Sequence, residues 1–328
     1  MKNYLTDVEG IKVGHCHDEV MGKGVTAIIC EEGATPGVDV RGSAPGTRET
    51  DLIESEKLVD KIHSVVLSGG SAFGLDASSG VMKYLDEKEI GFNTPFGIVP
   101  VVSQAVIYDL SSGDPKLRPN LEMGYKSAAK ASEDEVSRGC IGGGYGATIS
   151  KTMGWDKAIK SGLGSASVSH GNLVVSAMVV VNALGDIYDG KEQITGPFDK
   201  ESNTMYSSLE FMRQASIGFS NTNTTIGVIA TNAKLTKPMA NKLASMGHDS
   251  YARTIRPVHT MSDGDTVFAL GTNKVDCENF DLLLVLAVEA MDNAILDAVE
   301  SAESMNGYIS INDVRKLRWL LLKNGLLA

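Results

Sequence analysis

Small hydroxyl and amide side chains stand directly before an apolar, β-branched run in the segment FSNTNTTIGVIATN, residues 219–232. A threonine hydroxyl is a poor nucleophile unless a base lies beside it. If the chain is cut just before such a threonine, the freed α-amine, with a pKa of about 7.7–8, becomes that base. An asparagine in front suits this cleavage, since the hydroxyl can attack the preceding carbonyl. The segment is therefore a candidate N-terminal nucleophile.

The same residues also fit an ordinary strand, and the pattern alone favours that interpretation. Threonine has a high β propensity, and asparagine is common in turns. Strand alternation places Thr224, Ile226 and Val228 on one face and Thr225 and Gly227 on the other. Alternation does not tell which face holds a site, so both threonines remain candidates.

Four further polar residues have types that suit amide chemistry. Asn182 follows a long apolar run, where a buried amide is costly unless it finds partners. Asp263 and Asp265 flank a glycine just before a predicted strand, and Lys160 precedes a glycine turn. From the residues alone, the ordinary interpretations are stronger: a turn-forming asparagine, an Asp-Gly turn and a solvated lysine.

A glycine turn and a tyrosine are candidates for ligand contact. Gly69, Gly70 and Ser71 end a predicted strand and begin a predicted helix, so their backbone amides could form a nest for an anion or a carbonyl. The stretch lacks the GxGxxG spacing of a dinucleotide loop. Tyr108 closes another predicted strand, where a packed strand aromatic is the competing interpretation.

Metal binding has weak support in the sequence. His15 and His17 lie on one face of a predicted strand around Cys16, and two imidazoles could bind zinc. A zinc site normally has four ligands, and no second ligand pair follows. We therefore expect no metal and no cofactor.

Composition narrows the function classes. The chain has 328 residues, 42% hydrophobic and 22% charged, with a net charge of −11. Without a basic cluster, we expect no nucleic-acid partner. No signal peptide or membrane-spanning stretch is evident. The four cysteines contain no CxxC pair, which favours reduced thiols and a cytoplasmic location; they are Cys16, Cys30, Cys140 and Cys277.

Apolar periodicity predicts α/β packing with a mixed, largely antiparallel sheet. The predicted helices cover residues 48–62, 71–88, 120–136, 236–255, 278–304 and 311–325. The predicted strands cover residues 24–32, 63–70, 96–110, 141–151, 160–170, 172–190, 224–232 and 264–272. The small residues of 71–88 should let another element approach closely. Residues 189–223 are polar, which predicts an exposed loop. The sequence has no clear linker, which predicts a single domain, 1–328.

Two long motifs carry a family resemblance. VDVRGSAPGTRETDLI (residues 38–53) and VVLSGGSAFGLDASSGVM (residues 65–82) resemble the paired N-terminal signatures of the L-aminopeptidase/D-amidase, β-peptidyl aminopeptidase and nylon-oligomer hydrolase family. The segments IGGGYGATISK, KSGLGSAS, VVVNALGDI, NTTIGVIATNAKLTK and TMSDGDTVFAL follow in that family's order. The resemblance covers essentially the whole chain.

The resemblance implies a fold and a maturation step. Members have a four-layer α/β/β/α sandwich, are commonly tetramers or larger, and cut themselves before a Ser or Thr that begins a core strand. Carried over, the cut falls between Asn223 and Thr224, giving fragments 1–223 and 224–328, with Thr225 as the rival by one position. This chain has Asn-Thr where many members have Gly-Ser, which leaves the rate and extent of cleavage open.

The resemblance also implies roles for individual residues. Thr224 is the expected nucleophile and Asn182 an oxyanion donor. Asp263 and Asp265 are expected next to the nucleophile's amine, and Lys160 beside the nucleophile. Tyr108 is matched to an active-site tyrosine.

The expected function is an N-terminal-threonine amide hydrolase, most simply an aminopeptidase acting on small peptides or amides. Two alternatives remain. One is an acyltransferase of the ornithine acetyltransferase type, which also cleaves itself before a threonine but passes the acyl group to an amine. The other is a non-cleaving protein that binds small molecules or nucleotides with its glycine loops.

Overall fold

Two halves of a β-sheet lie face to face in the computed structural model, which describes residues 2–134, 136–214 and 223–323. The sheet has nine strands. They are β1 (Lys12–Asp18), β2 (Lys23–Val40), β3 (Thr47–Arg48), β4 (Ile62–Ser68), β7 (Val102–Val106), β10 (Leu163–His170), β11 (Leu173–Asn182), β16 (Thr224–Ala233) and β18 (Thr266–Val275).

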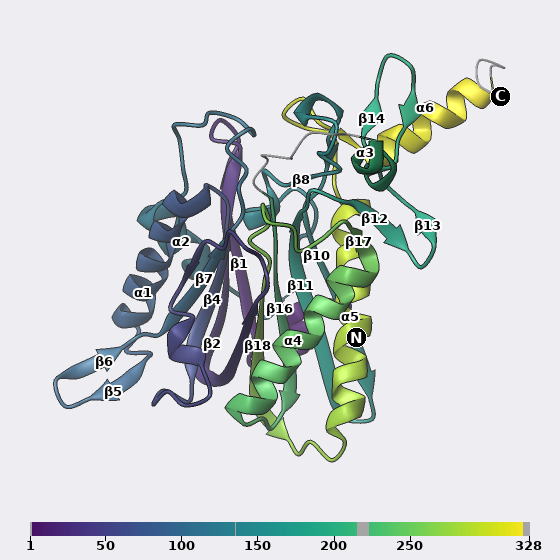
Figure 1. Ribbon diagram of the computed structural model, residues 1–328. Coiled ribbons are helices and arrows are strands. Elements are labelled where there is room, and N and C mark those ends of the chain that lie inside the picture. Colours follow the sequence, from purple (N-terminus) through teal and green to yellow (C-terminus); the bar gives the residue numbers. More distant parts are fainter. Residues whose placement is uncertain (1, 135, 215–222, 324–328) are drawn as a thin grey trace.

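The long strand β2 joins the two halves. The hydrogen-bonded order is β10-β11-β16-β18-β2-β4-β7-β3, with β1 also paired to β2. The first part of β2 pairs with β1 and β4, whereas its last part pairs with β18. The sheet therefore folds over along β2 (Figure 1). Pairing is mostly antiparallel, with β16–β18 and β4–β7 parallel.

Strand alternation separates the two faces of each half. Ile226 and Val228 of β16 belong to one buried cluster with Val65 and Leu67 of β4, between the halves. Ile229 belongs instead to the cluster on the outer, helix-covered face. Because side chains alternate along a strand, Thr224 shares the inner face with Ile226.

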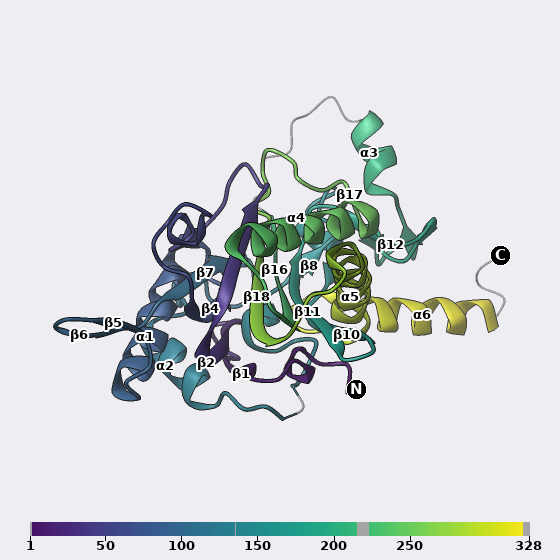
Figure 2. The same cartoon turned by 90° about the horizontal axis from the view of Figure 1, so that it is seen from below.

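Helices cover both outer faces. They are α1 (Ala77–Glu87), α2 (Leu121–Ala129), α4 (Lys237–Thr254) and α5 (Phe280–Glu300). The pair α4 and α5 packs on β11, β16 and β18, and the pair α1 and α2 packs on β2, β4 and β7 (Figures 1 and 2). Side chains of Asn120, Thr236 and Asn279 cap the N-termini of α2, α4 and α5. The predicted four-layer α/β/β/α sandwich is confirmed.

Glycines let α1 and α2 approach each other closely, as the small residues of 71–88 predict. A Cβ added at Gly124 would lie 1.8 Å from the Ala77 carbonyl oxygen, and one at Gly80 would lie 1.9 Å from that of Leu121. Backbone atoms cannot move aside as a flexible side chain can. This helix pair therefore depends on having no side chain at either position.

The remaining elements are short or lie at the edges. The strands are β5 (Phe92–Thr94), β6 (Gly97–Val99), β8 (Thr148–Ile149), β9 (Ile159–Lys160), β12 (Asp186–Asp189), β13 (Glu192–Gln193), β14 (Phe198–Asp199), β15 (Thr204–Met205), β17 (Ile255–Arg256) and β19 (Ile309–Ser310). The helices are α3 (Ser208–Gln214) and α6 (Ile311–Lys323). Short elements thus occupy much of the predicted loop 189–223, of which residues 215–222 lie outside the described residues.

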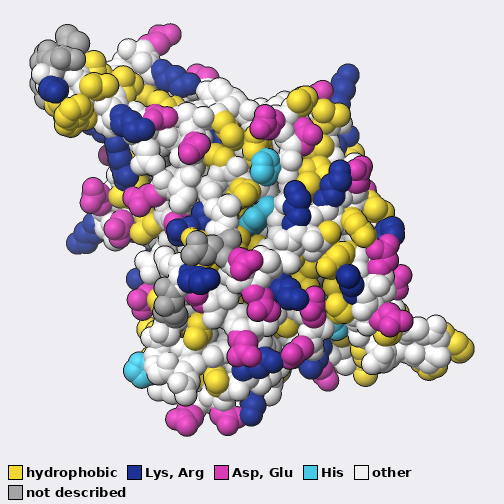
Figure 3. All heavy atoms as spheres, turned by 180° about the vertical axis from the view of Figure 1, so that it is seen from behind, with side chains coloured by type: hydrophobic (Ala, Val, Ile, Leu, Met, Phe, Trp, Pro, Cys, Tyr) yellow, Lys and Arg dark blue, Asp and Glu magenta, His cyan; other side chains and the backbone are white. Residues whose placement is uncertain are grey.

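Two features project from the body. The β5–β6 hairpin carries a fully exposed Phe96, and α6 exposes Trp319, Leu320 and Leu322. Seen from behind, apolar side chains gather on both projections, and acidic and basic side chains are interspersed over the rest of this face (Figure 3). Among the described helices, none combines the length and apolar character needed to cross a bilayer.

The helix predicted for residues 48–62 is wrong. The segment begins with Arg48, the last residue of the short strand β3, contains a 3₁₀ turn at Asp51–Ile53, and ends at Ile62, where β4 begins. Carbonyls that a helix would bond internally are used by a distant donor. The Lys237 ammonium donates to the carbonyl oxygens of Leu52 (3.3 Å) and Lys57 (3.0 Å). The long-range contact with Lys237 thus takes the place of the helical hydrogen bonds that the local periodicity predicts.

Replacing Gly124 with alanine tests the contact between α1 and α2. We expect Gly124→Ala to lower the free energy of unfolding by about 1–3 kcal/mol, because the new methyl overlaps backbone atoms of α1. Thermal unfolding followed by circular dichroism measures the change. Ala129→Ser, at an exposed position of the same helix, is the control. An unchanged or higher melting temperature for Gly124→Ala would contradict the contact.

Candidate active site

A small cavity opens where β16 begins. Its volume is about 110 Å³. Thr224, the first residue of β16, is one of its walls. The others are Ala44, Pro45, Gly46, Ser71, Ala72, Val106, Tyr108 and Asn223. The cavity thus takes residues from both halves of the sheet.

The backbone before Thr224 is held by the loop that precedes β18. The Asn223 N–H donates to the Ser262 carbonyl, and the Gly264 N–H donates to the Asn223 carbonyl, both at 3.0 Å. The Thr224 hydroxyl also donates to the Asn223 carbonyl oxygen. The hydroxyl therefore lies against the peptide group on its own N-terminal side. The Gly264 N–H polarises the same carbonyl.

Gly264 has no room for a side chain. A Cβ there would lie 2.6 Å from the Ala44 carbonyl oxygen and 2.9 Å from the Thr224 hydroxyl oxygen. The same loop binds the chain after β2, because the Ala44 N–H donates to the Asp263 carbonyl at 2.9 Å. The Asp-Gly turn seen in the sequence is thus present, but it also forms part of the cavity's surroundings.

Asp263 is a buried carboxylate with one oxygen available. Its Oδ2 accepts from the Thr260 N–H at 2.6 Å, whereas Oδ1 has no partner among the described residues. Burial, and after it the negative charge of Asp265, raises the pKa of Asp263 to about 6. A carboxyl of this kind changes protonation state close to neutral pH.

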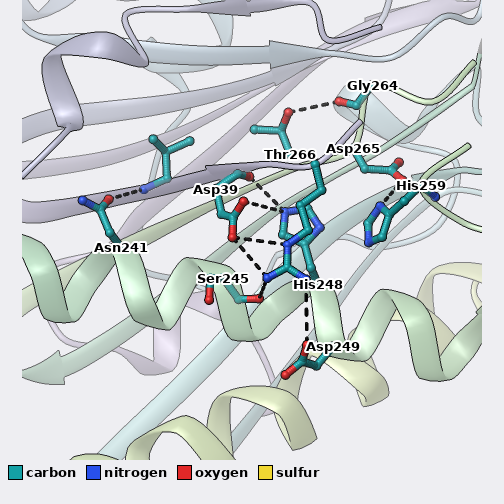
Figure 4. Close-up of polar contacts among 11 residues, drawn as sticks. Asp39, Asn241, Ser245, His248, Asp249, His259, Gly264, Asp265 and Thr266 are labelled. Atoms are coloured by element: carbon teal, nitrogen blue, oxygen red, sulfur yellow. Dashed lines mark hydrogen bonds and ion pairs between the residues drawn. The ribbon is translucent and has the colours of Figure 1, made fainter. Parts of the chain in front are cut away.

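Asp265 joins the start of β16 to a histidine. Its Oδ1 accepts from the Thr225 N–H at 2.7 Å. Its Oδ2 lies 2.8 Å from His259 Nδ1 and accepts from the His259 N–H at 3.2 Å (Figure 4). Since a carboxylate oxygen accepts, Nδ1 is the protonated ring nitrogen in this pair.

Asn182 is the last residue of β11 and pairs with Thr224 across the antiparallel ladder. Its Oδ1 accepts from the Thr148 N–H and from the Lys151 ammonium, both at 3.1 Å. Its Nδ2 donates to the Tyr108 carbonyl at 2.9 Å. These bonds fix the amide so that its N–H side faces a residue of the cavity wall. The buried amide thus has the partners that its burial requires.

Lys151 is the residue that the sequence interpretation missed. Its ammonium also donates to the Asn182 carbonyl oxygen at 2.9 Å, and the side chain is fully buried. Burial lowers its pKa to about 7, and the negative charges of Asp263 and Asp109 oppose that shift. The signal was available, because Lys151 ends the quoted segment IGGGYGATISK.

Lys160 is buried too, so it is not a solvated lysine. Its ammonium donates to the carbonyl oxygens of Ala147 (2.9 Å) and Ser161 (2.6 Å), and burial lowers its pKa. Within the described residues its hydrogen bonds do not reach Thr224. A place for Lys160 beside the nucleophile stays a prediction.

The glycine turn has its amides engaged within the protein. The N–H groups of Gly69, Gly70 and Ser71 donate to the Gly24 carbonyl, to Asp109 Oδ1 and to the Ile107 carbonyl, at 3.0, 2.7 and 2.9 Å. Ser71 lines the cavity, as does Tyr108. A binding role for the turn amides stays a prediction, and only Ser71 of the three borders the cavity.

Thr225 and the histidine pair lie elsewhere. The Thr225 hydroxyl is on the helix-covered face of β16, is buried, and has no partner among the described residues. His15 Nδ1 lies 2.9 Å from the Thr26 hydroxyl, and the His17 ring stacks on Tyr145. Over the described ranges, His, Cys, Asp and Glu side chains form no group of three or more that could hold a metal ion.

Comparison with known families identifies the class of enzyme. The family model for peptidase family S58 matches residues 3–311. The chain is a member of peptidase family S58. It is therefore a peptidase or amidohydrolase, and the family resemblance drawn from its motifs is confirmed. The cavity beside Thr224 is the candidate active site of this S58 peptidase.

Curated relatives align over most of the S58 peptidase. An uncharacterized aminopeptidase of Mycobacterium leprae (strain TN) is 38% identical, with 93% of this chain and 92% of the relative covered. A 6-aminohexanoate-oligomer endohydrolase of Kocuria sp. (strain KY2) is 31% identical, with 90% and 85% covered.

Solved structures agree on the fold. An L-aminopeptidase D-Ala-esterase/amidase from Ochrobactrum anthropi, described as a variant of the Ntn hydrolase fold, aligns with a TM-score of 0.74 at 19% identity, covering 100% of this chain and 95% of the other. A Burkholderia sp. β-aminopeptidase aligns with a TM-score of 0.71 at 19% identity, covering 98% and 94%.

Gly264→Ala tests the loop that holds Thr224. The added methyl overlaps a backbone oxygen and the Thr224 hydroxyl. We expect amide hydrolysis to fall by about 10²-fold, because a displacement of this size misaligns reacting groups. Hydrolysis of amino-acid p-nitroanilides measures it, and circular dichroism checks the fold. Met261→Ala, an 82% exposed position in the same loop, is the control. Full activity in Gly264→Ala would refute the assignment.

Lys151 predicts a pH dependence of stability. Burial lowers its pKa to about 7 in the folded protein, against an ordinary lysine value of 10.5. Between these values the unfolded chain binds a proton that the folded chain lacks, so Lys151 makes the free energy of unfolding rise with pH. We expect the melting temperature of the wild type, minus that of Lys151→Met, to increase from pH 7 to pH 10. Lys116→Met, at an exposed position, is the control. A pH-independent difference for Lys151→Met would contradict the buried state.

Proposed function

We propose that this S58 peptidase is an aminopeptidase that activates itself by cutting between Asn223 and Thr224. The observation that carries the proposal is the position of the Thr224 hydroxyl against the Asn223 carbonyl, with the Gly264 N–H on the same oxygen. A nucleophile and a hydrogen-bond donor for the developing oxyanion therefore meet at one peptide bond.

The first step is an acyl shift within the chain. The Thr224 hydroxyl oxygen attacks the Asn223 carbonyl carbon, the bond to the Thr224 nitrogen breaks, and the hydroxyl proton is transferred to that nitrogen. The product is an ester with a free α-amine. Water then hydrolyses the ester, which restores the hydroxyl and leaves a carboxylate on Asn223. The resulting fragments are 1–223 and 224–328.

The fragments have reason to stay together. The first element of the second fragment, β16, pairs with β11 of the first fragment, and β18 pairs with β2. Both strands are also packed between the inner cluster and the helices α4 and α5. Hydrolysis of one peptide bond removes none of these contacts. We therefore propose a single domain, 1–328, of two chains.

The freed amine then serves as the base for its own hydroxyl. Asp263 Oδ1, which has no partner within the described part of the chain, is a suitable acceptor for the new ammonium. Asp265 accepts from the N–H of Thr225, the next residue. Asn182 is the proposed oxyanion donor, and Lys151 keeps its amide oriented. The substrate carbonyl is attacked, its amine leaves, and water releases the acyl group from Thr224.

The substrate is proposed to be a small peptide or amide. The cavity of about 110 Å³ has room for a short acyl side chain beside Tyr108 and Ser71. The names of the relatives, aminopeptidase and 6-aminohexanoate-oligomer endohydrolase, refer to amide bonds of this kind. A homo-oligomer in the cytoplasm, with no cofactor, completes the proposal.

Intact mass spectrometry of the purified protein tests the proposal. We expect the wild type to give two fragments that break at Asn223/Thr224 and Thr224→Ala to remain one inactive chain. Thr225→Ala, which alters the other face of the same strand, is the matched control and should still be cut at the same bond. Amide hydrolysis by a single uncut wild-type chain would overturn the proposal. A break before Thr225 would move the nucleophile by one residue.

A further inference from the structure

We propose that His259 is a positioning residue, which fixes the Asp265 carboxylate against the start of the nucleophile strand. This inference rests on the proposed function, because it concerns the alignment of Thr224. Asp265 Oδ1 accepts from the N–H of Thr225, the residue after the nucleophile. Asp265 Oδ2 bonds His259 twice, through its ring Nδ1 and its backbone N–H. One side chain thus ties the histidine to β16.

The backbone of His259 is set for this task. Its φ is +55°, in the left-handed region that is uncommon for residues other than glycine, although asparagine, aspartate and histidine are enriched there. Two successive N–H groups then reach the two carboxylates: that of His259 donates to Asp265, and that of Thr260 donates to Asp263. Successive amides around a left-handed residue form a nest for negative groups. The single turn at residues 259–260 therefore holds the carboxylates of both Asp263 and Asp265.

Packing leaves the ring of His259 little freedom. The centroid of its ring lies 4.9 Å from that of the His248 ring, in an edge-to-face arrangement, and 6.2 Å from that of the Tyr251 ring. His248 Nε2 lies 2.9 Å from the Asp39 carbonyl oxygen (Figure 4). The Arg41 guanidinium donates to the Asp39 carboxylate at 3.3 Å. Burial lowers the pKa of His248 to about 4, so an uncharged ring backs His259 at neutral pH. A chain of contacts therefore connects Asp39 of β2, through His248 of α4 and His259, to Asp265.

The position of His259 separates its role from substrate binding. Its side chain is not among the residues that line the cavity beside Thr224. A loss of alignment at Asp265 should therefore lower kcat and slow self-cleavage while leaving KM nearly unchanged.

A matched pair of variants tests the role. Asparagine and aspartate have nearly the same shape and both accept a left-handed backbone, but only asparagine has a side-chain N–H to donate. We expect His259→Asn to keep self-cleavage and kcat within about tenfold of the wild type. We expect His259→Asp to lose about 10²-fold in kcat, with KM changed less than about threefold.

Chemical rescue gives a second measurement. His259→Gly keeps the backbone conformation and its N–H but lacks the ring donor. Added imidazole should restore part of its kcat. This variant also replaces His259→Asp if that one fails to fold, as judged by circular dichroism. Equal kcat in the asparagine and aspartate variants, or no rescue of the glycine variant by imidazole, would overturn the inference.

Failure of the proposed function would look different. It would appear as an active wild-type chain that stays uncut, or as a cleaved Thr224→Ala chain. Intact mass spectrometry measures both, and both chains keep His259. The contrast in kcat between His259→Asn and His259→Asp can be read in either case, because it needs only amide hydrolysis by the wild type.

Discussion

The site depends on one stretch of backbone pairing, between the start of β16 and the loop before β18. Asn223 bonds Ser262 and Gly264 through its own N–H and carbonyl, and β16 continues beside β18 as a parallel ladder. This pairing places the Thr224 hydroxyl on the inner face and turns two acidic side chains toward the same strand end. If it were lost, the hydroxyl, the polarised carbonyl and the carboxylates would no longer share one location.

Buried polar groups around this pairing are joined in networks, since isolated ones would be too costly. The amide of Asn182 connects Tyr108, Thr148 and Lys151, so the wall of the cavity, the end of β11 and a buried ammonium form one unit. Opposite charges are close enough to influence one another: the charge of Asp263 opposes the fall in the Lys151 pKa. A change at any member therefore affects the others, and effects of single substitutions will not add simply.

The sequence predicts the layered fold and the general site, but it does not place every lysine or helix. Periodicity locates α4, α5 and most strands because their apolar faces are long and regular. Alternation assigns Thr224 and Thr225 to opposite faces, yet only the packed sheet tells that the face of Thr224 looks inward. Lys160 ends the short strand β9, Lys151 lies two residues after β8, and both side chains are buried. Which of them reaches Asn182 depends on contacts between distant segments. Residues 48–62 fail as a helix for the same reason, since Lys237 takes their carbonyls.

The way β2 joins the halves has a consequence for the order of assembly. Val40 of β2 pairs with Thr266 of β18, and Asn182 pairs with Thr224, so the strand end that holds Thr224 is complete only after remote parts of the chain have met. Such long-range pairing is slow to form. Under the proposed chemistry, a half-made chain or a misfolded one would have its hydroxyl and carbonyl out of alignment and would stay whole. Cleavage would then occur only in molecules that have reached their native topology, so the cut chain would be evidence of correct folding.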